Sequence, residues 1–227
     1  MSLKRRATDR VIAHTGGRVA SGPFAGMKID PHLTSWGDGD VGARLLGIYE
    51  QPLHRLMMQF IESDPDCVVT LGCAEGYYSV GLARHLPDAR HVAVDISQRA
   101  LDIVNVHANQ NDVEVETHLQ LPDIPDGAVW IVDIEGDEQH VLNPKTRSEL
   151  KTATVVVELH PWVQPRVQQI LMERFLDTHD VYLIEDSNRS VNRFDFLADL
   201  PDEVRWSLAV EGRPQRMSWL VMTPMES

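Results

Sequence analysis

The chain has 227 residues, of which 43% are hydrophobic, and its 21 basic and 34 acidic residues give a formal net charge of −13 at pH 7. A basic surface that could hold phosphates is therefore not expected, which argues against a nucleic-acid partner. No apolar run is long enough for a membrane helix, and the two cysteines, Cys67 and Cys73, make no disulfide framework, so we expect a cytoplasmic protein without a membrane partner.

Residues 1–63 are predicted to form an irregular N-terminal arm followed by a helical cap. Glycine and turn signals dominate the first ~43 residues. From Ala43 to Ile61 the apolar residues recur at helical spacing, and Pro52 should kink this helix or start a second one. Asp64 and Pro65 should end it. Residues 64–227 are predicted to form the main domain.

The main domain alternates between strand and helix patterns. Strands are predicted at Cys67–Leu71, His91–Asp95, Val113–Thr117, Ala128–Asp133, Thr154–Leu159, Val181–Ile184 and Met217–Met222. Helices are predicted at 76–86, from the N-cap Ser97 to Gln110, at 139–151 with a break near Pro144, and at 164–177. This order favours an α/β fold, with a seven-stranded, mostly parallel sheet covered by helices on both faces. The last strand follows a long excursion and is expected to insert antiparallel.

Ligands of such sheets bind beyond the carboxyl ends of the strands. The first strand is followed by Gly72-Cys73-Ala74-Glu75-Gly76-Tyr77, a tight turn into a helix. Gly72 allows the sharp turn, and Gly76 allows a ligand and the helix to approach closely. Ala74 replaces the middle glycine that accommodates a pyrophosphate, which favours a nucleoside without phosphates over a dinucleotide. The alternative is an ordinary strand-to-helix turn.

Acidic residues and one histidine follow the other strands. Asp95, which ends the second strand, is placed to accept hydrogen bonds from ribose hydroxyls, or else to cap the next helix. Alternation puts Asp133 and Glu135 on one side of the fourth strand end, and Glu158 and His160 on one side of the fifth. Neighbouring strands would bring these four side chains together as a candidate catalytic cluster, unless they are helix caps and a structural His–Glu pair.

The segments VVTLGCAEGYYSVGLA, VAVDIS, VWIVDIEGDE and TVVVELH together resemble the class I S-adenosylmethionine (SAM)-dependent methyltransferases. The sequence is most similar to the FkbM-type branch, which pairs an Asp-x-Glu-Gly motif with a later Glu-x-His motif. The resemblance implies a Rossmann-like SAM-binding domain at residues 64–227 and methyl transfer to a small molecule, with oxygen preferred over nitrogen as the acceptor.

The resemblance also implies roles for individual residues. Those expected to bind the cofactor are Gly72, Cys73, Ala74, Glu75, Gly76 and Tyr77 around the methionine part, Asp95 at the ribose with Ile96 beside it, and Asp133. Asp133, Glu135, Glu158 and His160 would face the transferred methyl group. The family commonly has an acidic residue two positions before the first glycine, where this chain has Thr70; Glu75 is expected to take over its role.

Three alternatives remain open at this stage. In a metal-assisted version, Asp133, Glu158 and His160 would hold magnesium or manganese and lower the pKa of the acceptor hydroxyl. The chain could instead be an NAD-dependent oxidoreductase, which Ala74 disfavours, or a SAM-binding domain without activity. Carboxylates near His160, Glu158 above all, are expected to raise the pKa of the imidazole. The sequence does not indicate the acceptor or the oligomeric state.

Overall fold

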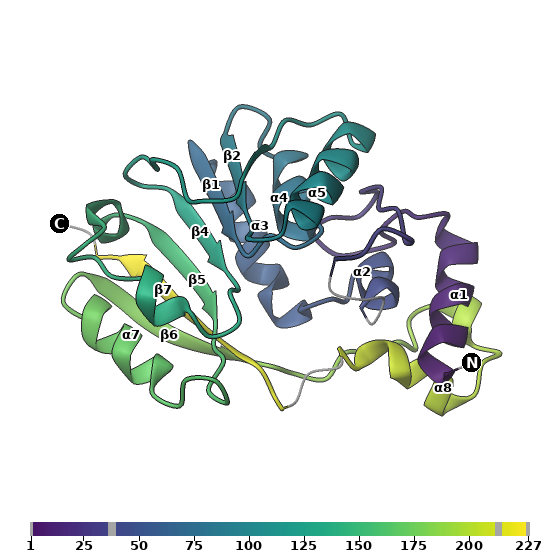
Figure 1. Ribbon diagram of the computed structural model, residues 1–227. Coiled ribbons are helices and arrows are strands. Elements are labelled where there is room, and N and C mark those ends of the chain that lie inside the picture. Colours follow the sequence, from purple (N-terminus) through teal and green to yellow (C-terminus); the bar gives the residue numbers. More distant parts are fainter. Residues whose placement is uncertain (1, 36–39, 212–214, 226–227) are drawn as a thin grey trace.

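A mixed β-sheet forms the centre of the structure, a computed structural model that describes residues 2–35, 40–211 and 215–225. In this part of the chain seven strands lie in the order β3-β2-β1-β4-β5-β7-β6. They are β1 (Cys67–Leu71), β2 (Arg90–Val94), β3 (Glu116–His118), β4 (Val129–Val132), β5 (Thr154–Glu158), β6 (His179–Glu185) and β7 (Ser218–Pro224). Strands β1 to β5 pair in parallel, and β7 is antiparallel to β5 and β6 (Figure 1). The predicted sheet and its antiparallel last strand are confirmed.

Helices cover both faces of the sheet, as predicted. Val68 and Ile131 belong to one apolar core, whereas their chain neighbours Val69 and Trp130 belong to the other. The first core is covered by α3 (His54–Ser63), α4 (Tyr77–Ala83) and α5 (Gln98–Gln110), and the second by α6 (Glu138–Val141), the 3-10 turn η2 (Ser148–Lys151) and α7 (Val167–Phe175). Because both faces are buried, the central strands are continuous apolar runs rather than alternating ones.

The N-terminal arm is more regular than predicted. Residues 3–15 form a helix, α1 (Leu3–Thr15), so the expectation of an irregular arm is wrong for this stretch. The Ser2 side chain accepts a hydrogen bond from the Arg5 N–H at the start, and Gly16 ends the helix in a left-handed conformation. Few apolar residues mark this helix in the sequence, because it buries only Ala7, Thr8 and Val11.

Helix α1 packs in a small lobe with residues from near the other end of the chain. This cap lobe consists of α1, α2 (Val41–Leu46), and residues 191–209, which include η3 (Asp195–Leu197), α8 (Asp202–Trp206) and η4 (Ser207–Ala209). It has an apolar core of its own, and Figure 1 shows α1 and α8 side by side. Arg10 Nη2 lies 2.7 Å from both carboxylate oxygens of Asp199, and the His14 ring stacks on Phe196.

The long helix predicted for residues 43–61 is divided. Helix α2 ends at Gly47, whose φ of +69° is left-handed, and a 3-10 turn, η1 (Gln51–Leu53), contains Pro52 and leads into α3. Pro52 therefore starts a second helix, one of the two outcomes expected for it, and Asp64 ends α3. None of the described helices combines the length and apolar character that a membrane crossing requires.

Candidate functional site

The turn between β1 and α4 is built by two glycines with different tasks. Gly72 has a φ of +80°, and a Cβ at this position would lie 1.6 Å from the carbonyl oxygen of Asp133 at the end of β4. Gly76, with a φ of +81°, caps α4, and a Cβ there would lie 3.1 Å from Val104 on α5. Gly72 thus allows two strand ends to meet. Gly76 serves the packing of two helices, which is only part of the role expected for it.

Asp95 links this turn to the start of α5. Its Oδ2 accepts a hydrogen bond from the Ala74 N–H at 3.0 Å, and its Oδ1 accepts one from the Ser97 N–H at 2.9 Å. The side chain is 6% exposed and lines a pocket. Each carboxylate oxygen carries two lone pairs, so a ligand hydroxyl can still donate to Asp95. The capping and the ligand-binding interpretations of Asp95 are therefore compatible.

Two adjoining cavities lie at the carboxyl ends of the strands. The outer pocket has a volume of about 440 Å³, and the inner pocket one of about 50 Å³. Of the residues proposed from the sequence, the outer pocket is lined by Gly72, Ala74, Asp95, Ile96, Asp133, Glu135, Glu158 and His160. The inner pocket adds Cys73, Glu75 and Tyr77. The structure thus brings together all the proposed site residues except Gly76, which lines neither pocket.

His160 lies at the centre of the predicted cluster and is 2% exposed. Its Nε2 is 3.5 Å from Asp133 Oδ1 and 3.4 Å from Glu135 Oε2. Its Nδ1 is 2.6 Å from Oε1 of Glu138, a residue of α6 that is fully buried. Because that carboxylate oxygen also accepts from the Gly136 N–H at 2.9 Å, it is held in place behind the ring. The imidazole therefore presents Nε2 toward the pocket.

These carboxylates decide the charge of the imidazole. Burial alone would lower the pKa of His160, but the hydrogen bond with Glu138 and the charges of Asp133, Glu138 and Glu135 outweigh it and raise the pKa above 6.5. The raised pKa agrees with the sequence-based expectation. The carboxylate that contributes most is Glu138 rather than Glu158, so that part of the expectation is wrong.

Replacing Glu138 by glutamine should lower the pKa of His160, which NMR titration of the imidazole measures directly. A raised folded-state pKa adds stability that is fully present below the unfolded pKa of ~6.5 and is lost as pH rises through the folded value. The variant should therefore lose stability mainly at acidic pH. The exposed Glu135 is the matched control: Glu135→Gln should shift the pKa of His160 less, and an equal or larger shift would contradict the assignment.

Asp133, Glu158 and His160 meet the geometric requirement for a cation site. Each offers one ligand atom, and these atoms lie within 4.8 Å of one another. Bonds of about 2.0–2.1 Å, as magnesium requires, would place such ligand atoms up to ~4.2 Å apart, so a small closure would suffice. A histidine that binds a metal usually has a carboxylate or carbonyl on its other ring nitrogen, and Glu138 occupies that position here. The residues present therefore fit a divalent cation.

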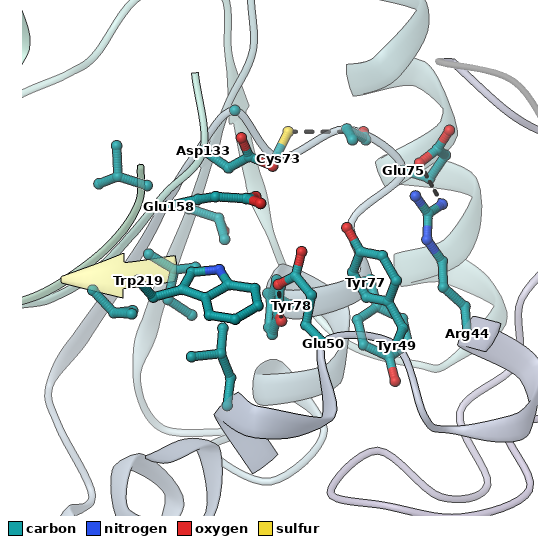
Figure 2. Close-up of a pocket in the computed structure, with 17 residues that line it drawn as sticks. Arg44, Tyr49, Glu50, Cys73, Glu75, Tyr77, Tyr78, Asp133, Glu158 and Trp219 are labelled. Atoms are coloured by element: carbon teal, nitrogen blue, oxygen red, sulfur yellow. Dashed lines mark hydrogen bonds and ion pairs between the residues drawn. The ribbon is translucent and has the colours of Figure 1, made fainter. Parts of the chain in front are cut away.

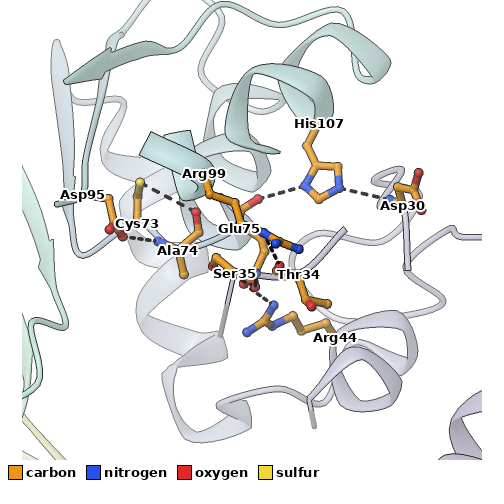
Figure 3. A network of polar contacts seen from close by, with 10 residues as sticks. All are labelled: Asp30, Thr34, Ser35, Arg44, Cys73, Ala74, Glu75, Asp95, Arg99 and His107. Carbon is orange, nitrogen blue, oxygen red and sulfur yellow. Dashed lines mark hydrogen bonds and ion pairs between the residues drawn. The ribbon is translucent and has the colours of Figure 1, made fainter. Parts of the chain in front are cut away.

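The Glu75 side chain connects the glycine turn to the N-terminal part of the chain through contacts with Arg44 and Ser35 (Figure 3). Its Oε2 lies 2.6 Å from Arg44 Nη1 on α2, and its Oε1 accepts from the Ser35 N–H at 2.6 Å. Nε2 of His107 accepts a hydrogen bond from the Asp30 N–H, so the other ring nitrogen, Nδ1, carries the proton. Nδ1 donates it to the backbone carbonyl of Glu75 at 2.8 Å. Burial would raise the pKa of Glu75, but Arg44 and Ser35 lower it overall. The carboxylate therefore stays ionised and fixed.

The inner pocket contains Glu50 and Tyr78, which the sequence analysis did not identify, beside Tyr77, which it did. Glu50, with a left-handed φ of +43°, accepts a hydrogen bond from the Tyr78 hydroxyl. The buried Tyr77 hydroxyl has no hydrogen-bond partner among the described residues, and Figure 2 shows it directed toward the space between Glu158 and Glu75. Burial raises the pKa of Tyr77, so the hydroxyl remains a donor. The pocket therefore offers both a donor and carboxylate acceptors to a small polar ligand.

No protein-family model matches the sequence, and no curated protein sequence is significantly similar to it. Many solved structures are similar in fold, among them the three methyltransferases that follow. The ribosomal protein L11 methylase from Lactobacillus delbrueckii subsp. bulgaricus has a TM-score of 0.51 and 16% identity over 88% of this chain and 86% of that one. An O-methyltransferase from Bacillus cereus in complex with SAH has a TM-score of 0.51 and 12% sequence identity, over 96% of this chain and 91% of that one. The O-methyltransferase TomG from Streptomyces achromogenes in complex with SAM has a TM-score of 0.51 and 14% sequence identity, over 98% of this chain and 100% of that one. The chain shares the Rossmann-like fold of these methyltransferases.

Proposed function

We propose that this chain is a SAM-dependent methyltransferase of the FkbM type that methylates a hydroxyl group of a small molecule. The observation that carries the proposal is the arrangement around Asp95. The carboxylate is fixed between the Ala74 and Ser97 N–H groups and faces a 440 Å³ pocket that also contains His160. The similar fold of structures whose names include SAH and SAM supports the same cofactor here.

The two pockets divide the ligands between them in this proposal. The ribose binds at Asp95, and the amino-acid part of SAM enters the inner pocket, where the Tyr77 hydroxyl can donate to its carboxylate. Its ammonium group then lies among carboxylates of the same pocket, which include Glu50 and Glu158. The acceptor occupies the rest of the outer pocket, near His160. Arg44 of the cap lobe lines both pockets. In this proposal Arg44 therefore lies between the cofactor and the acceptor.

Methyl transfer is a single displacement at the sulfonium carbon, so the protein has to align two molecules and remove one proton. The bond from the methyl carbon to sulfur breaks as the bond to the acceptor oxygen forms. The Nε2 atom of His160 takes the hydroxyl proton, and Glu138 stabilises the imidazolium that results through its 2.6 Å contact with Nδ1. Glu138 is thus proposed as a positioning residue behind the general base.

The metal-assisted version has specific support in the carboxylate behind His160. In that version Asp133, Glu158 and His160 would hold a magnesium or manganese ion. When bound, the ion would lower the pKa of the acceptor hydroxyl. Glu138 would then orient His160 as a neutral ligand rather than as a base.

Binding of SAM tests the proposed function. Calorimetry should show that the wild-type protein binds SAM and SAH, and that Asp95→Ala weakens binding by about 10–100-fold, because charge-assisted hydrogen bonds of ~1.5–3 kcal/mol are lost. Asp95→Asn keeps the size of the side chain and separates the loss of charge from disturbance of the turn. Asp102→Ala, an exposed carboxylate on α5, is the control and should bind normally. Absence of SAM binding, or tighter binding of NAD, would refute the proposal.

A further inference from the structure

The walls of the outer pocket are strongly acidic. Among the described residues that line it, seven are carboxylates and only Arg44 and His160 can carry positive charge. The carboxylates are Asp40, Asp95, Asp133, Glu135, Asp137, Glu158 and Glu211. Asp95 is assigned to the ribose, and Glu158 also lines the inner pocket. Burial raises the pKa of Glu211 to about 8, and this side chain lies 3.0 Å from Arg189, so it adds little negative charge. Asp40, Asp133, Glu135 and Asp137 remain at the outer pocket. Acidic residues are therefore more concentrated around this pocket than an even distribution of the net charge of −13 over 227 residues would give.

Both cationic groups are already matched by carboxylates behind them. Arg44 Nη1 lies 2.6 Å from Glu75, and His160 Nδ1 lies 2.6 Å from Glu138. Arg44 Nε has no hydrogen-bond partner among the described residues, but Glu75 already balances the guanidinium charge. An acceptor that carried a carboxylate or a phosphate would therefore gain little net attraction from Arg44 or His160. It would also approach several like charges, which is unfavourable in a partly enclosed pocket. Anionic acceptors are thus selected against.

Two of the carboxylates, Glu135 and Asp137, lie at the solvent-exposed part of the outer pocket. Glu135 and Asp137 lie on the loop after β4 and are exposed, and the side chain of Glu135 is 61% exposed. Trp162, which is 39% exposed and packs edge-on against His160, lines the same pocket. Carboxylates together with an aromatic ring are groups that attract an organic cation.

We infer that the acceptor is an amino alcohol, a small hydroxylated molecule that also carries a protonated amine, and this inference rests on the proposed function. The acidic wall binds the ammonium group and keeps it protonated, so the nitrogen has no lone pair with which to attack the methyl group. The hydroxyl oxygen therefore forms the new bond to carbon. The sulfonium sulfur keeps the electron pair of the broken bond, and the hydroxyl proton passes through His160 to water.

Two sets of matched compounds test the inference. The first consists of tyramine, N-acetyltyramine and 4-hydroxyphenylacetate, and the second of the methyl glycosides of glucosamine, N-acetylglucosamine and glucuronic acid. Methyl transfer from radiolabelled SAM, and binding to the SAH-loaded protein, should both favour the ammonium form over the carboxylate form by about tenfold or more in at least one set. The preference should decrease as salt is added, because Glu135 and Asp137 are exposed.

A double variant tests whether the acidic wall, represented by Glu135 and Asp137, causes this preference. Glu135→Gln/Asp137→Asn should reduce the preference several-fold while SAH affinity is retained. The control Glu62→Gln/Asp88→Asn makes the same charge change at two exposed positions that do not line the outer pocket, and it should retain the preference. The inference would be overturned if methyl transfer and binding were equal for the three compounds of each set, or if none of the compounds bound or reacted. A preference for the carboxylate compounds would overturn it as well. SAM binding in the same samples distinguishes that result from failure of the proposed function.

Discussion

Replacing His160 by glutamine is expected to slow methyl transfer by about 10²–10⁴-fold while SAM affinity changes little. The imidazole is held with Nε2 toward the outer pocket by the 2.6 Å contact between Nδ1 and Glu138, and glutamine cannot take up the acceptor proton. Single-turnover rates with labelled SAM, together with calorimetry, measure the two quantities separately. His140, an exposed histidine of α6, provides the control, and His140→Gln should react at the wild-type rate.

Chelation distinguishes the two versions of the mechanism. If His160 is the general base, treatment with a chelator should leave the rate unchanged. If Asp133, Glu158 and His160 hold a divalent cation, chelation should abolish activity and added magnesium or manganese should restore it. A normal rate in His160→Gln together with no effect of chelation would show that the cluster is structural. Catalysis would then depend on alignment of the two substrates alone.

The sheet and the proposed site residues at its strand ends were predictable because buried parallel strands have a simple sequence signature. Segments such as Thr154–Glu158 are apolar almost throughout, so a charged residue at their end stands out. The same reasoning placed Asp95 and His160 at the carboxyl edge of the sheet, where the structure has them. The positions of these residues follow from strand alternation and from the parallel order, and both can be read locally in the chain.

Glu138 could not be identified in the same way. It lies in α6, a helix of four residues, and a carboxylate in the first turn of a helix is ordinarily explained by the helix dipole. Its contact with His160 depends on the preceding loop, in which Glu135 has a left-handed φ of +56° and Gly136 a φ of +113°. Backbone conformation of this kind decides where the next side chain points, and no periodic pattern encodes it.

The cap lobe depends on contacts between distant parts of the chain. Residues 3–15 and 191–209 lack strong helical patterns, and their helices are stabilised by a shared apolar core and by contacts such as Arg10 with Asp199. Helix propensity is a weak predictor when tertiary packing supplies most of the stability. Arg44 and Glu50 were missed for a related reason, since polar residues within a helical pattern usually indicate its solvent-exposed face.

The turn after β1 can be tested with a pair of glycines whose backbone conformations are nearly the same. Gly72 has a φ of +80° and Gly127 a φ of +78°, so alanine should cost ~1–2 kcal/mol of backbone strain at either position. At Gly127 a Cβ would meet no atom within 4 Å, whereas at Gly72 it would lie 1.6 Å from the Asp133 carbonyl oxygen. That neighbour is backbone at the end of β4, so the two strand ends would have to separate.

Gly72→Ala is therefore expected to lower the free energy of unfolding by about 1–3 kcal/mol more than Gly127→Ala, measured by urea denaturation of both variants. The separation would also displace Asp133 relative to His160 and change the shape of the inner pocket, because Gly72 and Asp133 both line it. SAM binding should then be lost in Gly72→Ala and retained in Gly127→Ala. Equal destabilisation by the two substitutions would mean that the turn adapts, and that the close contact between β1 and β4 does not hold the pocket in shape.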